Sequence, residues 1–424
     1  MASPEGRLWT SRGCRHKSTD AMNLRRQLLL AFLTVLPAAV SAQSVVSNTI
    51  LIPLYYKPVN DAFKLGIYAS LGGGTPQIFE FDTGGWGFYA AYATNNQSPW
   101  WGSAFNTTSQ QVKESYDSGI EYHGSVVTTA VSLYADQHSS IPLVTTAETT
   151  RVGQMTNISN TNGASYWTPQ GEVTNGTPPI DQQFYGDFGM GLSYASNGIV
   201  NIVMQLAFTN GITPGFRVRA HGYSPYLQIG LTAADTNSSS AFYFGMNTNT
   251  NAPPGEVFPV SEKGFYSEQV FNANMTISNS TTNFSTNVGI TADTGASTTI
   301  HNANLGGIPE ALYTNDGKAL YVVGGADFGL SGLTVEGNET NFFNSVTTDK
   351  QVSIQEGGFV TNLFYLNSGI ALFQQYDVIY NLQDGQIGFE PIPEPSTWAL
   401  LGTAALGFGL AYLRDRKAKQ DSPR

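Results

Sequence analysis

The sequence predicts an all-β protein of two similar lobes, with few and short helices. Short runs of alternating apolar and polar residues are separated by turns rich in Gly, Asn and Pro, and strands do not alternate with long helical patterns. A strand-like run that ends in Asp-Thr-Gly also occurs twice, at 78–84 and at 289–295. About 0.2 such triplets are expected by chance at this composition, so two copies indicate a duplicated lobe.

The first half of the chain is predicted to consist mainly of β-hairpins. An edge strand is expected at 44–60. Residues 63–82 form the first hairpin, because their alternating pattern breaks at a Gly- and Pro-rich turn over 72–76. A second hairpin is expected over 114–133, with Tyr116 near its tip.

The remaining segments of this half have weaker patterns. Polar stretches with little periodicity, at 91–111 and 150–182, are expected to be loops. A small-residue turn is expected at 185–192 and a short helix at 200–208.

The second half repeats the scheme of strands and turns. Strands are expected at 242–245 and 255–260, and a short helix is expected at 308–312. The last strand pair, around a Gln-Asp-Gly turn, is expected at 376–380 and 386–389.

The composition and charge limit which partners the protein can bind and indicate whether disulfides are expected. The chain has a formal net charge of −11, and more than half of its Lys and Arg lie before Gln43 or after Pro393. The part between them is therefore strongly acidic, which disfavours nucleic acid as a partner. The one cysteine, Cys14, precedes the expected mature start, so no disulfide is expected.

The N-terminus has the pattern of a secretion signal. Arg25 and Arg26 precede an apolar run at 28–36, and Val40-Ser41-Ala42 forms a small-residue cleavage site. Met22, just upstream of this pattern, is an alternative start of the protein. The sequence therefore predicts an exported protein.

The two triplets point to proton chemistry, because they would bring Asp82 and Asp293 face to face. Two carboxylates about 3 Å apart cannot both ionise cheaply, so such a pair holds one proton over a wide pH range. The ionised member can remove a proton from water while the protonated member polarises a carbonyl group. The alternative is that each Asp only caps its own turn and the Gly supplies a positive φ.

The segment from Phe63 to Pro391 resembles the pepsin-like aspartic endopeptidases. The resemblance rests on both triplets, on the Gly-Thr-Pro turn before the first, and on Tyr-Asp-Ser-Gly at the tip of a flap-like hairpin. It implies a two-lobed double β-barrel with the active-site cleft between the lobes. Further similar segments, in the order of the family, are 189–192, 244–245, 258–260, 264–266, 369 and 386–391.

The resemblance implies an aspartic-type endopeptidase that acts on a polypeptide substrate as a monomer, without a cofactor or a metal. The glycines would let the backbone approach the carboxylates, and the threonine hydroxyls would join the two loops. The implied residues are catalytic Asp82 and Asp293, supporting Thr83, Gly84, Thr294 and Gly295, and Tyr116 and Gly119 of the flap.

The sequence departs from the family's pattern in two places. Gly85 follows the first triplet where the family usually has Ser or Thr, so one hydroxyl donor to Asp82 is absent. The closing element at 366–369 is more polar than in the family. These departures favour an alternative function, a non-catalytic pepsin-fold protein of the cell surface or biofilm matrix, whereas the two retained aspartates favour the peptidase.

A second resemblance concerns the C-terminus. Residues 393–402, which begin Pro-Glu-Pro, are similar to the PEP-CTERM sorting signal of Gram-negative bacteria and imply recognition by an exosortase. The apolar run from Thr397 to Leu413 is 17 residues long, at the short end for a membrane span, and basic residues follow it. The predicted division of the chain is a signal region at 1–42, an N-terminal lobe at 43–235, a C-terminal lobe at 236–392 and a sorting segment at 393–424.

Two other kinds of chemistry have little support in the sequence. There is no His-Glu-x-x-His and no cysteine pair, so no metal site is expected. A Gly-x-Ser-x-Gly element is also absent, which disfavours a Ser-His-Asp hydrolase. The histidines of the expected mature chain are isolated from one another: His123, His138, His221 and His301.

Overall fold

A computed structural model describes most of the chain between Val45 and Ile392. Within that range it leaves out residues 60–61, 94–98, 117, 161–164, 168–177, 194–196, 250–264, 303–306 and 357–363. The described residues all fall in one unit of the chain, Gln43–Arg424. The predicted signal region, the predicted sorting segment from 393 on, and the strand expected at 255–260 lie outside them.

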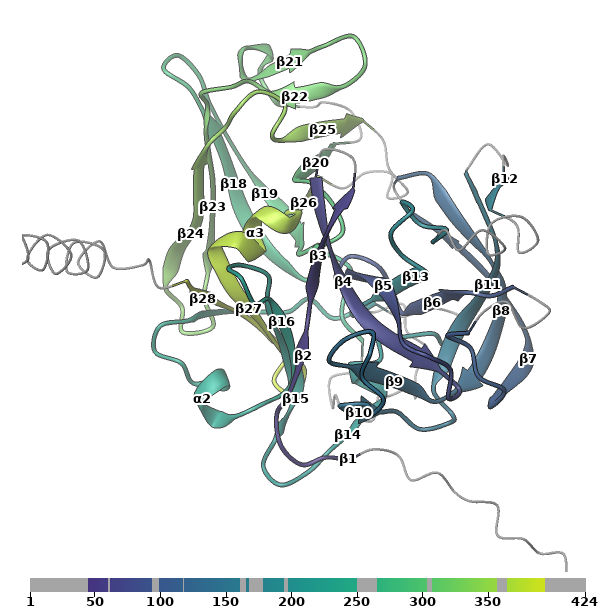
Figure 1. Cartoon of the computed structure of the whole chain (residues 1–424). Helices are drawn as coiled ribbons and strands as arrows, with labels where there is room; N and C mark the ends of the chain where they lie inside the picture. The colour runs from purple at the N-terminus through teal and green to yellow at the C-terminus, as the bar shows by residue number, and fades with distance from the viewer. Residues whose placement is uncertain are drawn as a thin grey trace, which may run out of the picture. The chain divides into compact units, whose positions relative to one another are not determined.

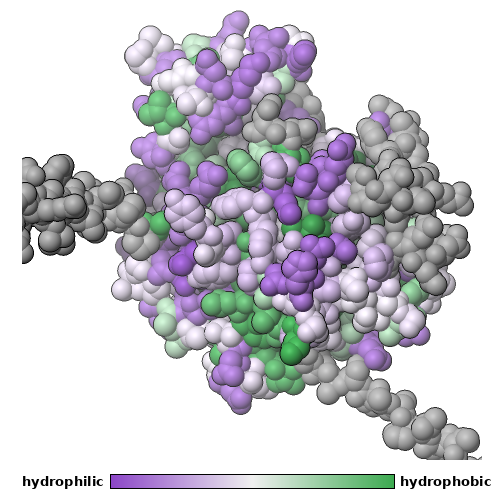
Figure 2. Space-filling model, in the orientation of Figure 1, coloured by the Kyte–Doolittle hydropathy of each residue, from purple (hydrophilic) through white to green (hydrophobic). Residues whose placement is uncertain are grey.

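β-strands make up most of the described chain, as the sequence predicts (Figure 1). The described helices are short. Most large apolar side chains are buried, and Figure 2 shows a face of mixed hydrophilic and hydrophobic residues with a hydrophobic patch in its lower part. These helices are α2 (Ala233–Thr236) and α3 (Ile370–Gln375), with the 3-10 turns η2 (Val203–Gln205) and η3 (Glu310–Leu312).

The first large sheet is built from the first half of the chain. Its main path has the order β10-β9-β4-β5-β13-β6-β11-β8-β7, with β3 paired to β4 and β12 to β11. Its strands are β3 (Tyr55–Val59), β4 (Ala62–Leu71), β5 (Gln77–Asp82), β6 (Phe88–Ala91), β7 (Phe105–Ser115), β8 (Ile120–Thr129), β9 (Val131–Tyr134), β10 (Val144–Thr145), β11 (Arg151–Asn160), β12 (Ser165–Trp167) and β13 (Gly186–Gly189).

The second large sheet comes from the second half and forms the green group of strands in Figure 1. Its order is β21-β22-β25-β20-β26-β19-β18-β23-β24. Its strands are β18 (Phe271–Ser278), β19 (Asn283–Thr291), β20 (Thr299–Asn302), β21 (Tyr313–Asn315), β22 (Leu320–Val322), β23 (Asp327–Leu333), β24 (Glu339–Val346), β25 (Ser353–Glu356) and β26 (Tyr365–Asn367).

A third sheet combines strands from both halves of the chain. Its order is β17-β28-β27-β15-β16-β2, so β27, near the end of the described chain, pairs with β15, which belongs to the predicted N-terminal lobe. A separate parallel pair joins β1 (Val45–Val46) to β14 (Ala207–Phe208). The strands of the third sheet are β2 (Ile50–Pro53), β15 (Thr213–Arg219), β16 (Tyr226–Leu231), β17 (Phe242–Gly245), β27 (Tyr376–Asn381) and β28 (Gln386–Pro391).

The same three-strand arrangement surrounds both Asp-Thr-Gly triplets, which confirms two lobes of similar construction. In the first sheet β5 is parallel to β13, and β13 is antiparallel to β6. In the second sheet β19 is parallel to β26, and β26 is antiparallel to β20. Each triplet therefore follows a central strand with a parallel neighbour. The boundary predicted between 235 and 236 stays a prediction.

The strand that leads to the first triplet is buried on both faces. All residues of β5 from Ile78 to Asp82 are buried, which explains the nearly continuous apolar run in the sequence. The rings of Phe79 and Phe188 each pack against Phe88, with centroid distances of 4.8 and 5.0 Å. This packing fixes the position of Asp82 at the end of the strand.

Several local predictions are confirmed by the described strands. The first hairpin is β4–β5 around the turn after Leu71, and the second is β7–β8 with Tyr116 at its tip. The last strand pair is β27–β28, and the strand expected at 242–245 is β17. The helix expected at 308–312 is present as the 3-10 turn η3.

Two loop predictions are wrong in part. Strand β7 already begins at Phe105, and β11 occupies 10 residues near the start of the segment 150–182. Strand β11 pairs with both β6 and β8 and buries Val152, Met155 and Ile158. Pairing with neighbours, rather than its own weak alternation, therefore makes this segment a strand.

Two further local predictions are corrected. The turn expected at 185–192 contains the strand β13, whose pairing partners β5 and β6 are far away in the sequence. The helix expected at 200–208 is reduced to the 3-10 turn η2, and the chain continues into β14. Tertiary pairing again overrides the local pattern.

Candidate active site

The two Asp-Thr-Gly triplets lie against each other. Thr83 N donates to Thr294 Oγ1 at 3.1 Å, and Thr294 N donates to Thr83 Oγ1 at 2.9 Å. Thr83 Oγ1 donates to Ala292 O at 2.8 Å, and Thr294 Oγ1 donates to Phe81 O at 2.9 Å. The contacts are almost symmetric, so the hydroxyls join the two loops in the way that the resemblance implies.

Each glycine of the triplets faces the carboxyl group of the opposite triplet. A Cβ atom at Gly84 would lie 2.4 Å from Asp293 Cγ, and one at Gly295 would lie 2.6 Å from Asp82 Cγ. Real Cβ atoms do not approach so closely, so glycine is required at both places. The arrangement brings Asp82 and Asp293 to one point between the lobes.

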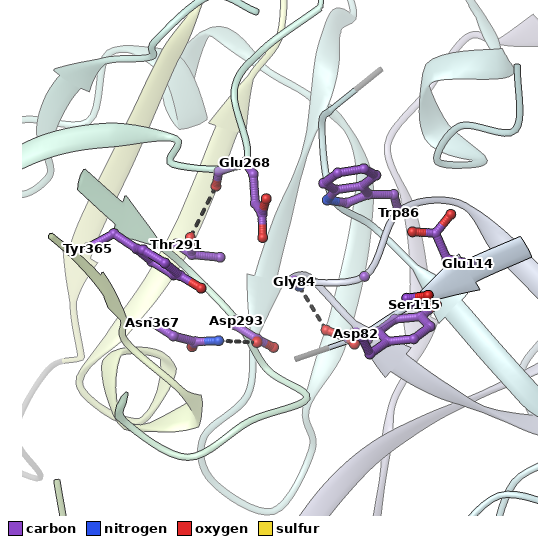
Figure 3. A pocket seen from close by; sticks show the side chains of 12 residues that line it. Asp82, Gly84, Trp86, Glu114, Ser115, Glu268, Thr291, Asp293, Tyr365 and Asn367 are labelled. Atoms are coloured by element: carbon purple, nitrogen blue, oxygen red, sulfur yellow. Dashed lines mark hydrogen bonds between the residues drawn. The ribbon is translucent and has the colours of Figure 1, made fainter. Parts of the chain in front are cut away.

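Each glycine also holds the aspartate of its own triplet. Gly84 N donates to Asp82 Oδ1 at 2.7 Å, and Gly295 N donates to Asp293 Oδ1 at 2.6 Å. Figure 3 shows the first of these bonds, with both carboxyl groups at the floor of the pocket. Backbone amides therefore fix one oxygen of each carboxyl group.

Burial disfavours the ionised form of Asp293. Burial, followed by the negative charge of Asp82, raises the pKa of Asp293 well above its usual range. A hydrogen bond from Asn367 Nδ2 to Asp293 Oδ2, at 2.6 Å, opposes this shift (Figure 3). Burial and the neighbouring carboxyl group therefore favour the protonated form of Asp293.

The predicted flap is the tip of the β7–β8 hairpin. Gly119 N donates to Tyr116 O at 2.8 Å, and Gly119 has a φ of 82°, which favours glycine in this tight turn. Tyr116 borders the same two cavities as Asp82 and Asp293. The structure thus brings both predicted flap residues to one turn beside the carboxyl pair.

The Tyr116 hydroxyl has a partner that the sequence did not reveal. It donates to Asp187 Oδ2 at 2.6 Å. Asp187 lies on β13 opposite Glu80 of β5 and is 2% exposed. Burial and the charges of Asp82 and Glu80 raise the pKa of Asp187 well above its usual range.

Two cavities of about 140 Å³ each border the carboxyl pair. The first is lined from the side of the flap by Glu114 and Trp86, and from the second lobe by Glu268 and Tyr365 (Figure 3). Burial raises the pKa of Glu114 to about 7. Aromatic rings and groups able to hydrogen-bond thus surround the pair on both sides.

The two residues that sequence reasoning missed each carry a weak signal. Asn367 belongs to the closing element whose polarity departs from the family's pattern. Asp187 is a charged residue within a small-residue and apolar segment, where an acidic side chain needs a specific reason. Neither signal identifies the partner, because pairing with strands that are distant in the sequence decides which group each side chain meets.

The described residues contain no group of three or more His, Cys, Asp or Glu side chains that could hold a metal ion. The side chains of Asp82, Asp293 and Asp187 are instead engaged by backbone amides, an amide side chain and a phenol. The arrangement can therefore bind water and transfer protons with its own carboxyl groups.

The described part of the chain has the pepsin-like fold. The chain is similar in structure to the aspartic proteinase from Irpex lacteus, with a TM-score of 0.50 and 13% sequence identity over 82% of this chain and 99% of that chain. It is also similar to Basic 7S globulin from soybean, with a TM-score of 0.46 and 10% identity over 81% of this chain and 96% of that chain. No curated protein matches the sequence.

The C-terminus carries an export signal. Residues 391–417 match the family described as the PEP-CTERM protein-sorting motif, which confirms the resemblance noted in the sequence. This signal is recognised by an exosortase and directs export to the cell envelope. Among the residues that the structure describes, no helix is long and apolar enough to cross a membrane, and the run from Thr397 to Leu413 lies outside them.

Proposed function

We propose that the chain is an exported aspartic endopeptidase, which hydrolyses peptide bonds with a water molecule held between Asp82 and Asp293. The observation that supports this most is the close packing of each triplet's glycine on the opposite aspartate. It leaves two buried carboxyl groups in one space, which is the arrangement needed to share a proton.

The proposed reaction uses the two aspartates in different protonation states. The Asp82 carboxylate accepts a proton from the water, whose oxygen attacks the peptide carbonyl carbon, while Asp293 donates its proton to the carbonyl oxygen. In the next step Asp82 passes its proton to the leaving nitrogen, and Asp293 takes back a proton from the tetrahedral intermediate. The bond to nitrogen breaks, and the pair returns to its starting state.

The proposed substrate is an extended polypeptide. Trp86 and Tyr365 offer apolar surface on opposite sides of the pair, and Glu114 and Glu268 offer polar groups in the same cavity. The flap turn at Tyr116 lies beside this cavity and could cover a bound chain. Activity should be highest in acid, where one proton stays on the carboxyl pair.

A non-catalytic role in the envelope is the second candidate, and one contact favours it. Asn367 Nδ2 donates a hydrogen bond to Asp293 Oδ2 at 2.6 Å. That oxygen is one of those that would otherwise hold the attacking water. A binding protein with the same fold would retain the cleft without turning over a peptide.

The deciding experiment is cleavage of an unfolded protein by the purified protein between about pH 3 and pH 7. We expect cleavage that pepstatin blocks, and loss of at least about a thousandfold in kcat for Asp82→Asn and for Asp293→Asn. Asp327→Asn, at an exposed position, is the matched control and should keep full activity. Absence of both cleavage and pepstatin binding over this pH range would reject the peptidase.

A further inference from the structure

The residue after the first triplet, Gly85, lies beside the Asp82 carboxyl group. Gly85 has no side chain, and a Cβ atom built there would lie 3.0 Å from Asp82 Oδ2. The same Cβ would lie 2.7 Å from Asp187 Oδ2. The Asp187 carboxyl group thus occupies the space that a side chain at residue 85 would use.

Backbone pairing holds Asp187 in this space. Strand β13 lies parallel to β5, with Gly189 opposite Asp82, and Met190 N donates to Asp82 O at 2.6 Å. Gly191 N donates to Gly85 O at 2.7 Å. These bonds fix the backbone of the strand that carries Asp187 relative to the end of the strand that carries Asp82.

One carboxyl oxygen of Asp187 has no hydrogen-bond partner among the described residues. Its Oδ2 accepts from the Tyr116 hydroxyl at 2.6 Å, whereas its Oδ1 is buried without a hydrogen-bond partner among the described residues. A buried carboxylate with so few donors is costly, whereas a carboxylic acid is neutral and carries a donor of its own.

The surroundings also favour the neutral acid. The titratable groups that face Asp187 are Lys64, Glu80, Asp82, Tyr89, Tyr116 and Tyr122. The single cation among these groups, Lys64, already pairs with Glu80 at 2.8 Å and with Asp181 at 3.0 Å. Burial and the nearby acidic groups raise the pKa of Asp187, in agreement with this geometry.

We propose that Asp187 is a positioning residue for Asp82: its carboxylic acid donates to Asp82 Oδ2 in place of the hydroxyl that residue 85 lacks, while Tyr116 holds Asp187 from the flap. The catalytic consequence rests on the proposed function, whereas the contact itself does not. Gly85 is then a necessary partner of Asp187, since a larger residue would displace the acid.

A double-mutant cycle tests this exchange of donors. With Asp187 present, Gly85→Ser should lower kcat, because the serine Cβ would clash with the Asp187 carboxyl group. Asp187→Ala should lower kcat by about ten- to a hundredfold with little change in KM, and should move the acid limb of the kcat/KM profile to higher pH. Asp187→Asn keeps a donor and should retain most of the activity.

The double variant Gly85→Ser/Asp187→Ala decides the proposal. Its serine has room and places a hydroxyl beside Asp82 Oδ2, so kcat should recover at least about tenfold over Asp187→Ala alone. Gly245→Ser and Asp327→Ala are matched controls, because Gly245 has open space around it and Asp327 is exposed. A double variant no more active than Asp187→Ala would overturn the proposal, as would purely additive effects.

The same variants separate this proposal from the peptidase. If the wild-type protein cleaves nothing, the proposed function fails. The contact between Asp187 and Asp82 is then tested by measuring the free energy of unfolding of the wild-type protein and the three variants with a denaturant. We expect the double variant to be more stable than either single variant, because each change relieves the defect of the other. Additive losses of stability would reject the contact whatever the activity.

Discussion

At the scale of single residues, the hydroxyls of Thr83 and Thr294 hold the two Asp-Thr-Gly loops in register. Each hydroxyl accepts from one backbone amide and donates to one carbonyl of the opposite loop. Both side chains are buried, so water cannot replace a lost bond. Replacing a hydroxyl by a methyl group would leave an amide and a carbonyl without partners.

Thr294→Val should therefore lower the free energy of unfolding by about 2–4 kcal/mol. Thr294→Ser keeps the hydroxyl and loses only a methyl group, so it should cost about 1 kcal/mol. Chemical denaturation of the two variants measures the difference. Equal losses for valine and serine would show that the cross-loop bonds contribute nothing beyond packing.

At the scale of elements, the β7–β8 hairpin has a tip turn that depends on glycine and a stem whose pairing is interrupted by one register shift between Thr107 and Gln111. The strands pair from Phe105 opposite Thr129 to Ser115 opposite Glu121, and the reversal depends on Gly119 with its φ of 82°. The hydroxyl of Tyr116 then fastens the tip to Asp187 on β13. Below the tip, β8 pairs along its length with β11, so the flap belongs to the first sheet and the bond from Tyr116 adds a contact at its tip.

Gly119→Ala should disturb the flap without unfolding the lobe. The positive φ costs an alanine about 1 kcal/mol, so we expect kcat/KM to fall by about fivefold and amide exchange to accelerate at the hairpin tip only. Gly119→Asn is the control, because asparagine tolerates this conformation better. Uniformly faster exchange across the first sheet would argue against a local effect.

At the scale of the whole molecule, buried carboxyl groups should make the protein most stable in acid. Burial raises the pKa of Glu114 to about 7, above the usual 4.5. The folded state then binds the proton more tightly, so this stabilisation is present below about pH 4.5 and is lost as the pH rises towards 7. Asp293 and Asp187 shift in the same direction.

Glu114→Gln should flatten this pH dependence. Between about pH 4.5 and pH 7 the wild-type protein should lose about 1–3 kcal/mol through Glu114, allowing for its partial exposure, and the variant should lose correspondingly less. Denaturant midpoints measured at intervals across the range test this. An identical slope for both proteins would mean that Glu114 titrates near its usual value.

The sequence predicts the fold class and the central pair because both depend on repeated local patterns. The run from Ile78 to Asp82 is recognisable since it is buried on both faces, and its copy before Asp293 shows the duplication. Asp187 and Asn367 could not be predicted in this way, because parallel pairing with strands distant in the sequence places them beside the two triplets. The sequence does not predict strand β11 for the same reason, because its pairing with β6 and β8, and not a clear alternation of its own residues, makes it a strand.

The third sheet also sets an order of events for a secreted protein. Strand β27 pairs with β15, and β28 ends at Pro391, where the sorting motif begins. This sheet can close only after β27 and β28 have been synthesised, because β27 pairs with β15, more than 150 residues earlier in the chain. Completion of the third sheet, and with it the connection between the first and second halves of the fold, is therefore expected to be a late step of folding.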